Sequence, residues 1–285
     1  MQSWREFSKL ALVTGTLALS AATARAEITD KRTLKDSVRV PGSGSPTVIV
    51  KNVFGSVHVI AHDGATVDMT ATETVTGDLH ADIERARKEV ELRTESEDGR
   101  VAFRVRRIGS ESSDCCNRWE GYRVAYDIEV RVPRDAAVEV STVNDGDVVV
   151  EGVRGTFEVH NVNGGVRLTG LRGAGHVATV NGPVSATFER GPAAATSFKT
   201  INGKIDVSFP QDLAADLSFK TMHGEIYTDF DSQPISSEPV RDRSRDGGKL
   251  VVRAEHGSSI RVGKGGPAYS FETLNGNVYV RKTTR

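Results

Sequence analysis

The apolar and polar positions of this chain repeat with a period of about 20 residues. Each copy runs from an apolar residue through two spacers to a second apolar residue, then to a polar residue and Gly, as in Phe198–Gly203. An apolar strand follows each turn. The copies end at Gly146, Gly164, Gly182, Gly203, Gly224, Gly257 and Gly276, and the one over Val252–Gly257 is degraded. Such a period is typical of a solenoid whose units cannot bury a core alone.

Each copy predicts one rung, made of a strand, an Asn-Gly turn, a second strand and a second turn. Asn and Gly are expected at the first turn because left-handed backbone geometry is cheap only for these residues. Stacked rungs would lie about 4.8 Å apart, so equivalent apolar residues would form columns. The predicted columns place Phe198 on Phe219, Ile201 on Met222 and Ile205 on Ile226.

A polar residue recurs between the two apolar positions of the repeat. It is Thr142, Asn161, Thr179, Thr200, Thr221 and Thr273 in six of the seven copies. This column either forms a polar ladder inside the solenoid or lies at a bend, and the period does not decide between them.

The pattern is less regular before the repeats. Residues 27–46 form a lead-in segment, with a short strand expected around Ser37–Val40. Residues 47–137 form a divergent N-terminal β part, in which Val48–Ile60 looks like a first copy of the repeat. Tyr122–Val132 alternates strictly between apolar and polar side chains, so one face of that strand must be buried.

Two local patterns in the N-terminal part predict a helix and a hairpin, and a third pattern predicts a loop within the repeats. A helical face of apolar residues predicts a short helix over Ala81–Lys88. Glu97–Gly99 is a hairpin signal between two strands. The regular repeats occupy residues 138–285, and the stretch rich in Ser, Pro, Asp and Arg at about residues 229–248 is expected to be an extruded loop.

The first 26 residues have the three parts of a signal peptide. Arg5 and Lys9 precede the apolar run Leu10–Ala22, and Ala24–Ala26 supplies small residues for cleavage. The run is shorter than the ~20 residues that span a bilayer. We therefore expect cleavage after Ala26, export to the periplasm or the outside of the cell, and a mature chain without a membrane span.

Composition and charge narrow the function classes. The chain has 37 basic and 38 acidic residues, a net charge of -1, so no nucleic-acid partner is expected. No dinucleotide fingerprint, phosphate loop or nucleophile-elbow motif occurs, so we assign no cofactor and no catalytic residue. The histidines lack the spacing of metal ligands, so no metal is expected, and His223 and His256 fill the turn position of Asn as structural residues.

Cys115 and Cys116 are adjacent and are the only cysteines of the chain. In an exported protein such residues are expected to be oxidised. A strained vicinal bridge or an intermolecular disulfide is the first interpretation, free thiols are the second, and a metal site is the third.

The Asn-Gly strand repeat, entered through Tyr126–Pro133 and placed behind a signal peptide, resembles the bacterial putative-adhesin family of unknown function. The likeness covers about Val48–Val280. It implies an all-β fold, a single-stranded β-solenoid of right-handed β-helix type, here with a less regular N-terminal part that contains one short helix. The family defines no catalytic residues that could be transferred to this chain.

Together these features predict a non-catalytic exported binding or scaffold protein, an adhesin-like envelope component, with an envelope glycan or another envelope protein as partner. Lys199, Lys220 and Lys204 lie near equivalent turns and would contact an anion such as a uronate or a phosphate. The alternative is a polysaccharide lyase or hydrolase of β-helix type, with Asp206, Glu225, Lys204 and Lys220 around the turns. A partner in envelope-stress signalling is a third class.

Overall fold

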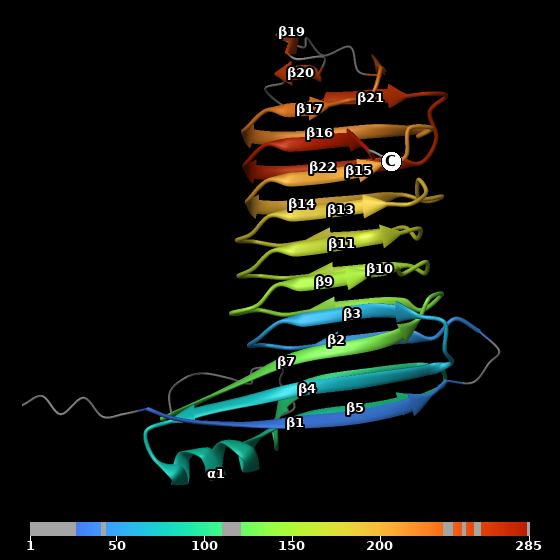
Figure 1. Ribbon diagram of the computed structural model, residues 1–285. Helices are drawn as coiled ribbons and strands as arrows, with labels where there is room; N and C mark the ends of the chain where they lie inside the picture. The colour runs from blue at the N-terminus through green and yellow to red at the C-terminus, as the bar shows by residue number, and fades with distance from the viewer. Residues whose placement is uncertain are drawn as a thin grey trace, which may run out of the picture.

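The computed structural model describes residues 27–40, 44–109, 121–235, 242–246, 249–253 and 258–283. Over these ranges the chain forms a stack of rungs, seen in Figure 1 as a column of short strands above a wider N-terminal base. Two sheets run along the stack, and most rungs contribute one strand to each sheet. The predicted all-β solenoid with a short helix in its N-terminal part is confirmed.

Sheet A has 12 strands and sheet B has 11. In spatial order, sheet A consists of β1 (Ile28–Arg39), β4 (Thr66–Gly77), β7 (Tyr122–Pro133), β3 (Val57–His62), β9 (Val148–Glu151), β11 (Val166–Leu171), β13 (Val184–Phe188), β15 (Ile205–Phe209), β23 (Val278–Lys282), β17 (Ile226–Thr228), β20 (Lys249–Arg253) and β19 (Asp242–Asp246). Sheet B consists of β18 (Ser232–Pro234), β21 (Ser258–Val262), β16 (Ala215–His223), β22 (Ala268–Asn275), β14 (Thr196–Asn202), β12 (Gly175–Ala178), β10 (Phe157–His160), β8 (Ala137–Ser141), β2 (Thr47–Lys51), β6 (Arg100–Arg107) and β5 (Val90–Glu97). The middle of each sheet is parallel, and antiparallel pairs lie toward the ends.

The core lies between the two sheets, because alternate side chains of every rung point inward. In the middle of the stack these are mainly valines. Toward the C-terminal end they become aromatic, and the Phe271 ring stacks between Phe198 and Phe219 with centroid distances of 5.3 and 5.2 Å. One continuous apolar column therefore runs through the molecule.

The order of the rungs departs from the order of the chain at the base, where β2 lies between β6 and β8 and β3 lies between β7 and β9, and again near the C-terminal end. β22 lies between β14 and β16, and β23 lies between β15 and β17. The predicted direct stacking of Phe198 on Phe219 and of Ile205 on Ile226 is therefore wrong, because Phe271 and Val278 of the last rung separate the two pairs. Figure 1 shows this last rung, in red, inside the orange part of the stack.

The described turn glycines do not adopt the left-handed backbone that the sequence suggested, since Gly146, Gly164, Gly182, Gly203, Gly224 and Gly276 are absent from the described residues with positive φ angles. A Cβ at Gly182 would instead lie 2.1 Å from the carbonyl oxygen of Gly164, and a Cβ at Gly203 would lie 2.1 Å from that of Gly182. Gly is required here because successive rungs approach each other too closely for a side chain.

The recurring Thr column points into the solenoid. Thr200 is 1% exposed, and its hydroxyl donates to the carbonyl oxygen of Gly182 at 2.9 Å. Thr179 does the same toward Gly164, also at 2.9 Å. This column is thus an internal polar ladder that satisfies buried carbonyl groups between rungs.

The predicted core column of Ile201 and Met222 is wrong. These side chains are 38% and 67% exposed. The preceding Thr of each copy faces inward, so the next residue of the strand must face outward. Leu274 has the same place in the rung between them and is also 38% exposed.

The N-terminal part begins with a longer strand than expected. β1 spans Ile28–Arg39 and pairs antiparallel with β4 along its whole length, whereas only a short strand around Ser37–Val40 was predicted. Charged residues fill its exposed first half, so the apolar alternation starts only at Leu34.

The other N-terminal predictions are confirmed. Helix α1 spans His80–Glu89 and buries Ile83 and Ala86. The β5–β6 hairpin turns at Asp98 and Gly99, with φ angles of 46° and 76°. β7 spans Tyr122–Pro133, and its apolar face is buried.

The stretch at about residues 229–248 is not simply an extruded loop. It contains β18, which pairs antiparallel with β21, and β19, which forms a hairpin with β20. β20 and β21 run antiparallel to β17 and β16, so the copy that ends at Gly257 builds no regular rung. Strands here cover the end of the stack, where unpaired edges would otherwise be exposed.

Candidate functional site

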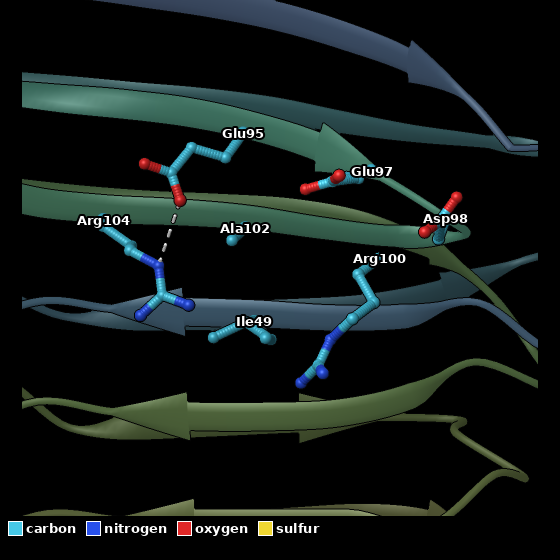
Figure 2. Close-up of a pocket in the computed structure, with 7 residues that line it drawn as sticks. All are labelled: Ile49, Glu95, Glu97, Asp98, Arg100, Ala102 and Arg104. Atoms are coloured by element: carbon cyan, nitrogen blue, oxygen red, sulfur yellow. Dashed lines mark ion pairs between the residues drawn. The ribbon is translucent and has the colours of Figure 1, made fainter.

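Two shallow pockets lie on the outer face of sheet B. The first has a volume of about 340 Å³ and is lined by Ile49, Glu95, Glu97, Asp98, Arg100, Ala102 and Arg104. The register of β2, β6 and β5 builds it, since Ala102 pairs with both Ile49 and Glu95. Figure 2 shows Ile49 and Ala102 between the two arginines.

The floor of the first pocket is apolar and its rim is charged. Ile49 and Ala102 are 3% and 5% exposed, although they face away from the core. Arg104 Nε lies 3.5 Å from Glu95 Oε2, as the dashed line in Figure 2 marks. Such a rim offers planar donors for a carboxylate or phosphate and acceptors for hydroxyl groups.

The second pocket, of about 130 Å³, lies farther along the same face. It is lined by Lys51, Glu139, Val140, Ser141, Glu158 and His160. His160 Nε2 lies 3.0 Å from Glu158 Oε1, and the rings of His160 and His176 have their centroids 5.4 Å apart.

The charges around these two histidines shift pKa values. The hydrogen bond from His160 lowers the pKa of the Glu158 carboxyl. Partial burial lowers the pKa of His176 below 6.5, and the charge of His160 adds to this effect. No local motif marks this pair, because residues 160 and 176 are brought together only by the parallel pairing of β10 with β12. In the described ranges no group of three His, Cys, Asp or Glu residues could hold a metal ion.

The lysines of the predicted anion site have other partners. Lys199 and Lys220 do not lie one strand apart, because β22 separates their strands. Glu272 stands between them, with its oxygens 3.4 Å from each ammonium group. Partial burial acts to raise the pKa of Glu272, but the two lysines outweigh it and lower that pKa. Lys204 is on the other side of the turn, 3.9 Å from Asp206.

The charged group considered for catalysis is not assembled. Asp206 lies on sheet A and accepts a hydrogen bond from Arg281 at 2.9 Å. Glu225 precedes β17 of the same sheet and accepts a hydrogen bond from the Tyr227 hydroxyl. Lys220 lies on sheet B beside Glu272. The four residues therefore do not face one common point.

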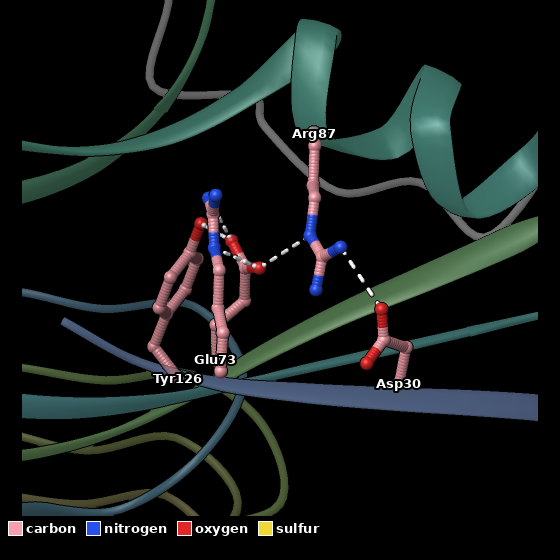
Figure 3. A network of polar contacts seen from close by, with 5 residues as sticks. Asp30, Glu73, Arg87 and Tyr126 are labelled. Carbon is pink, nitrogen blue, oxygen red and sulfur yellow. Dashed lines mark hydrogen bonds and ion pairs between the residues drawn. The ribbon is translucent and has the colours of Figure 1, made fainter.

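A buried carboxylate in the N-terminal part was not predicted from the sequence. Glu73 is fully buried in β4 and accepts hydrogen bonds from Tyr126 at 2.9 Å, Arg87 at 2.9 Å and Arg32 at 2.8 Å. Figure 3 shows Arg87 reaching down from α1 to Glu73 and Asp30. Burial, together with the charge of Glu73, raises the pKa of Tyr126 well above its usual range.

The Glu73 network joins α1 to sheet A, and it is fully paired. The sequence contained a sign of this network, because Glu73 lies on the same face of β4 as the apolar residues Val67, Met69, Ala71 and Val75. A carboxylate on the buried face of a strand requires partners of this kind.

Other predicted features lie outside the described residues. These are Cys115 and Cys116, the turn residue His256 and the signal peptide of residues 1–26. Among the helices that the structure describes, none has the length and apolar character to cross a membrane.

The fold and its outer faces define a two-sheet β-solenoid with mixed charges on a rigid surface. Residues 127–258 match the family model described as Toastrack DUF4097. This part of the chain is thus similar to the Toastrack DUF4097 family, which bears out the predicted likeness to the putative-adhesin family. None of the curated proteins matches the chain.

Two solved structures are similar over most of the chain. A putative cell adhesion protein from Clostridium sporogenes ATCC 15579 is 10% identical, with a TM-score of 0.36, over 88% of this chain and 100% of that chain. A putative adhesin from Bacteroides fragilis NCTC 9343 is 12% identical, with a TM-score of 0.39, over 88% of this chain and 97% of that chain. At such values the likeness carries no information about ligand or activity.

Proposed function

We propose that this protein is a non-catalytic, adhesin-like binding or scaffold protein of the bacterial envelope, and that the outer face of sheet B holds an acidic envelope glycan. The first pocket is the observation that supports this function. Its apolar floor suits the apolar face of a sugar ring, and Arg100 and Arg104 suit the carboxylate of a uronate. Glu95, Glu97 and Asp98 would accept hydrogen bonds from sugar hydroxyls.

A rigid sheet supports this binding role. Apart from Asp98 at the β5–β6 turn, the lining residues come from three hydrogen-bonded strands, so the pocket needs no ordering step when a ligand arrives. The separation of Asp206 and Glu225 from Lys220 weighs against the lyase or hydrolase, because acid–base chemistry needs such groups around one bond.

The test is a calorimetric titration of the purified protein with a uronic-acid oligosaccharide and with its neutral counterpart. The wild type should bind the acidic sugar in a salt-sensitive manner. Replacement of both Arg100→Gln and Arg104→Gln should weaken binding about tenfold or more, since charge-assisted hydrogen bonds are lost. Arg172→Gln is the matched control, because Arg172 pairs with Glu189 away from the pocket.

Two outcomes would contradict the proposal. Equal affinity of the double variant and the control would remove the pocket from the binding site. Release of reducing sugar by the wild-type protein, lost on replacing a carboxylate, would make it an enzyme instead.

The envelope assignment includes export. The mature protein should begin at Glu27, which N-terminal sequencing of the protein from a fractionated native host would show. Envelope material that still begins at Met1 would contradict cleavage after Ala26.

A further inference from the structure

The last rung of the chain is inserted between two earlier rungs. β22 pairs in parallel with β14 on one side and with β16 on the other. β23 likewise pairs in parallel with β15 and with β17. Residues 268–282 therefore fill a slot whose two walls, residues 196–209 and 215–228, are complete before the last rung is reached in the chain.

The last rung matches both walls in three ways. Its Phe271 stacks on an aromatic ring on either side, at 5.3 and 5.2 Å. Its Glu272 pairs with a lysine on either side, at 3.4 Å each. Asn275 donates its amide to Asn202 Oδ1 at 2.7 Å, while its own Oδ1 lies 3.1 Å from His223 Nδ1.

The two walls share a lysine that the insert lacks. Both have the order Phe, Lys, Thr, apolar residue, turn residue and Gly, over Phe198–Gly203 and Phe219–Gly224. Direct contact between them would place Lys199 beside Lys220, and like charges directly opposite are destabilising. The insert has Glu at that position, so the slot selects the sequence of the last rung.

The link to the last rung is short and rich in glycine. It reads Gly-Lys-Gly-Gly-Pro over Gly263–Pro267, and Gly263 and Gly265 have φ angles of 59° and 74°. Exchange of an identical element between copies keeps every contact except those of such a link, and is therefore a low-cost route to association.

We infer that the C-terminal rung, Ala268–Lys282, is an exchangeable segment that fills the same slot in a second copy of this chain. Two copies would then be joined by reciprocal insertion of their last rungs. This goes beyond the proposed glycan function, because the slot lies at the C-terminal end of the stack and uses none of the residues that line the first pocket.

The first experiment offers a fluorescent peptide of residues 266–283 to the full chain just below its thermal transition, followed by cooling and gel filtration. The peptide should be retained, at up to one per chain. A peptide with Glu272→Lys is the control and should be retained about tenfold less, since two ion pairs become two like-charge contacts. Retention of both peptides to the same extent would overturn the inference.

The second experiment covers the case in which a free peptide enters too slowly. Full chains with two different tags are incubated together and mixed dimers are captured. A disulfide between Ser218→Cys and Ser270→Cys, residues paired across β16 and β22, should abolish the mixed dimers in a background with Cys115→Ser and Cys116→Ser. Absence of both peptide retention and mixed dimers, or mixed dimers that persist in the cross-linked protein, would overturn the inference.

Discussion

Each residue of the repeat has a separate task at the Asn-Gly edge. Gly allows close approach of the rungs, Thr donates to the carbonyl oxygen thus brought near, and Asn bonds to the Asn of the next rung. These tasks depend on neighbours in other rungs, so substitution at this edge tests the stacking itself.

The two glycines of one turn should respond differently to a methyl group. A Cβ at Gly164 would lie 2.2 Å from the carbonyl oxygen of Gly146, whereas a Cβ at Gly165 meets nothing closer than 3.4 Å. Gly164→Ala should lower the free energy of unfolding by about 3 kcal/mol, and Gly165→Ala by about 1 kcal/mol or less. Urea denaturation measures both, and equal losses would contradict the steric explanation.

His176 should make stability depend on pH. Its folded-state pKa is lowered by burial and by His160 and Lys199, while Glu158 opposes the shift. The unfolded chain therefore binds the proton more readily, so the free energy of unfolding should fall as pH drops through 6.5 and level off below the folded-state pKa.

Urea titrations between about pH 5 and 8 test this dependence. His176→Gln should flatten the slope, and His80→Gln, at an exposed position of α1, should not. A ring-proton titration of His176 by NMR should have its midpoint below 6.5. A midpoint above that value would contradict the effect of burial.

At the scale of elements, α1 is held by charge as well as by apolar contact. It buries only Ile83 and Ala86, and its Arg87 bonds to a fully buried carboxylate in β4. The strand and the helix are thus coupled through one side chain, Glu73.

Glu73→Gln should destabilise the N-terminal part by about 3 kcal/mol, because the charge that pairs with Arg32 and Arg87 is lost while Tyr126 stays buried. Glu84→Gln, on the exposed side of α1, should change stability by less than about 0.5 kcal/mol. Hydrogen exchange would locate the loss in α1 and β4. A loss spread evenly over the whole stack, or one no larger than that of Glu84→Gln, would contradict the anchoring role.

At the scale of the whole molecule, the period-2 and 20-residue patterns were sufficient for the solenoid, because strand faces and turn spacing are local properties. β7 is an example, since its alternation alone defines its buried face. The place of the last rung could not be predicted, because Phe198–Gly203 and Phe219–Gly224 look like adjacent copies and nothing local marks a rung between them.

The candidate site was harder to predict than the fold. The first pocket depends on the parallel pairing of β2 with β6, which are far apart in the chain, and on Ile49 being covered on an outward face. The lysine positions were identified, but their partner Glu272 follows from the rung order alone. Sequence patterns therefore gave the strands, while the charges on their surface depended on topology.

The Asn ladder has a consequence for the chemical lifetime of the protein. Asn181 and Asn202 each precede Gly, the arrangement in which the Gly nitrogen most readily attacks the Asn side chain and releases ammonia. In the folded state the amides bond to one another at 2.8 Å, and the N–H groups of Gly182 and Gly203 donate to neighbouring rungs at 3.0 and 3.1 Å.

Folding should therefore slow deamidation at these sites, and an unfolded chain should deamidate faster. Each conversion to Asp replaces an amide donor by a carboxylate, and carboxylates on successive rungs would repel each other. Peptide mass spectrometry should find Asn181 and Asn202 intact after prolonged incubation of native protein and converted in urea, with Asn52, which precedes Val53, intact in both. The extent of deamidation at the Asn-Gly turns of the repeat would then report how long each molecule had been unfolded.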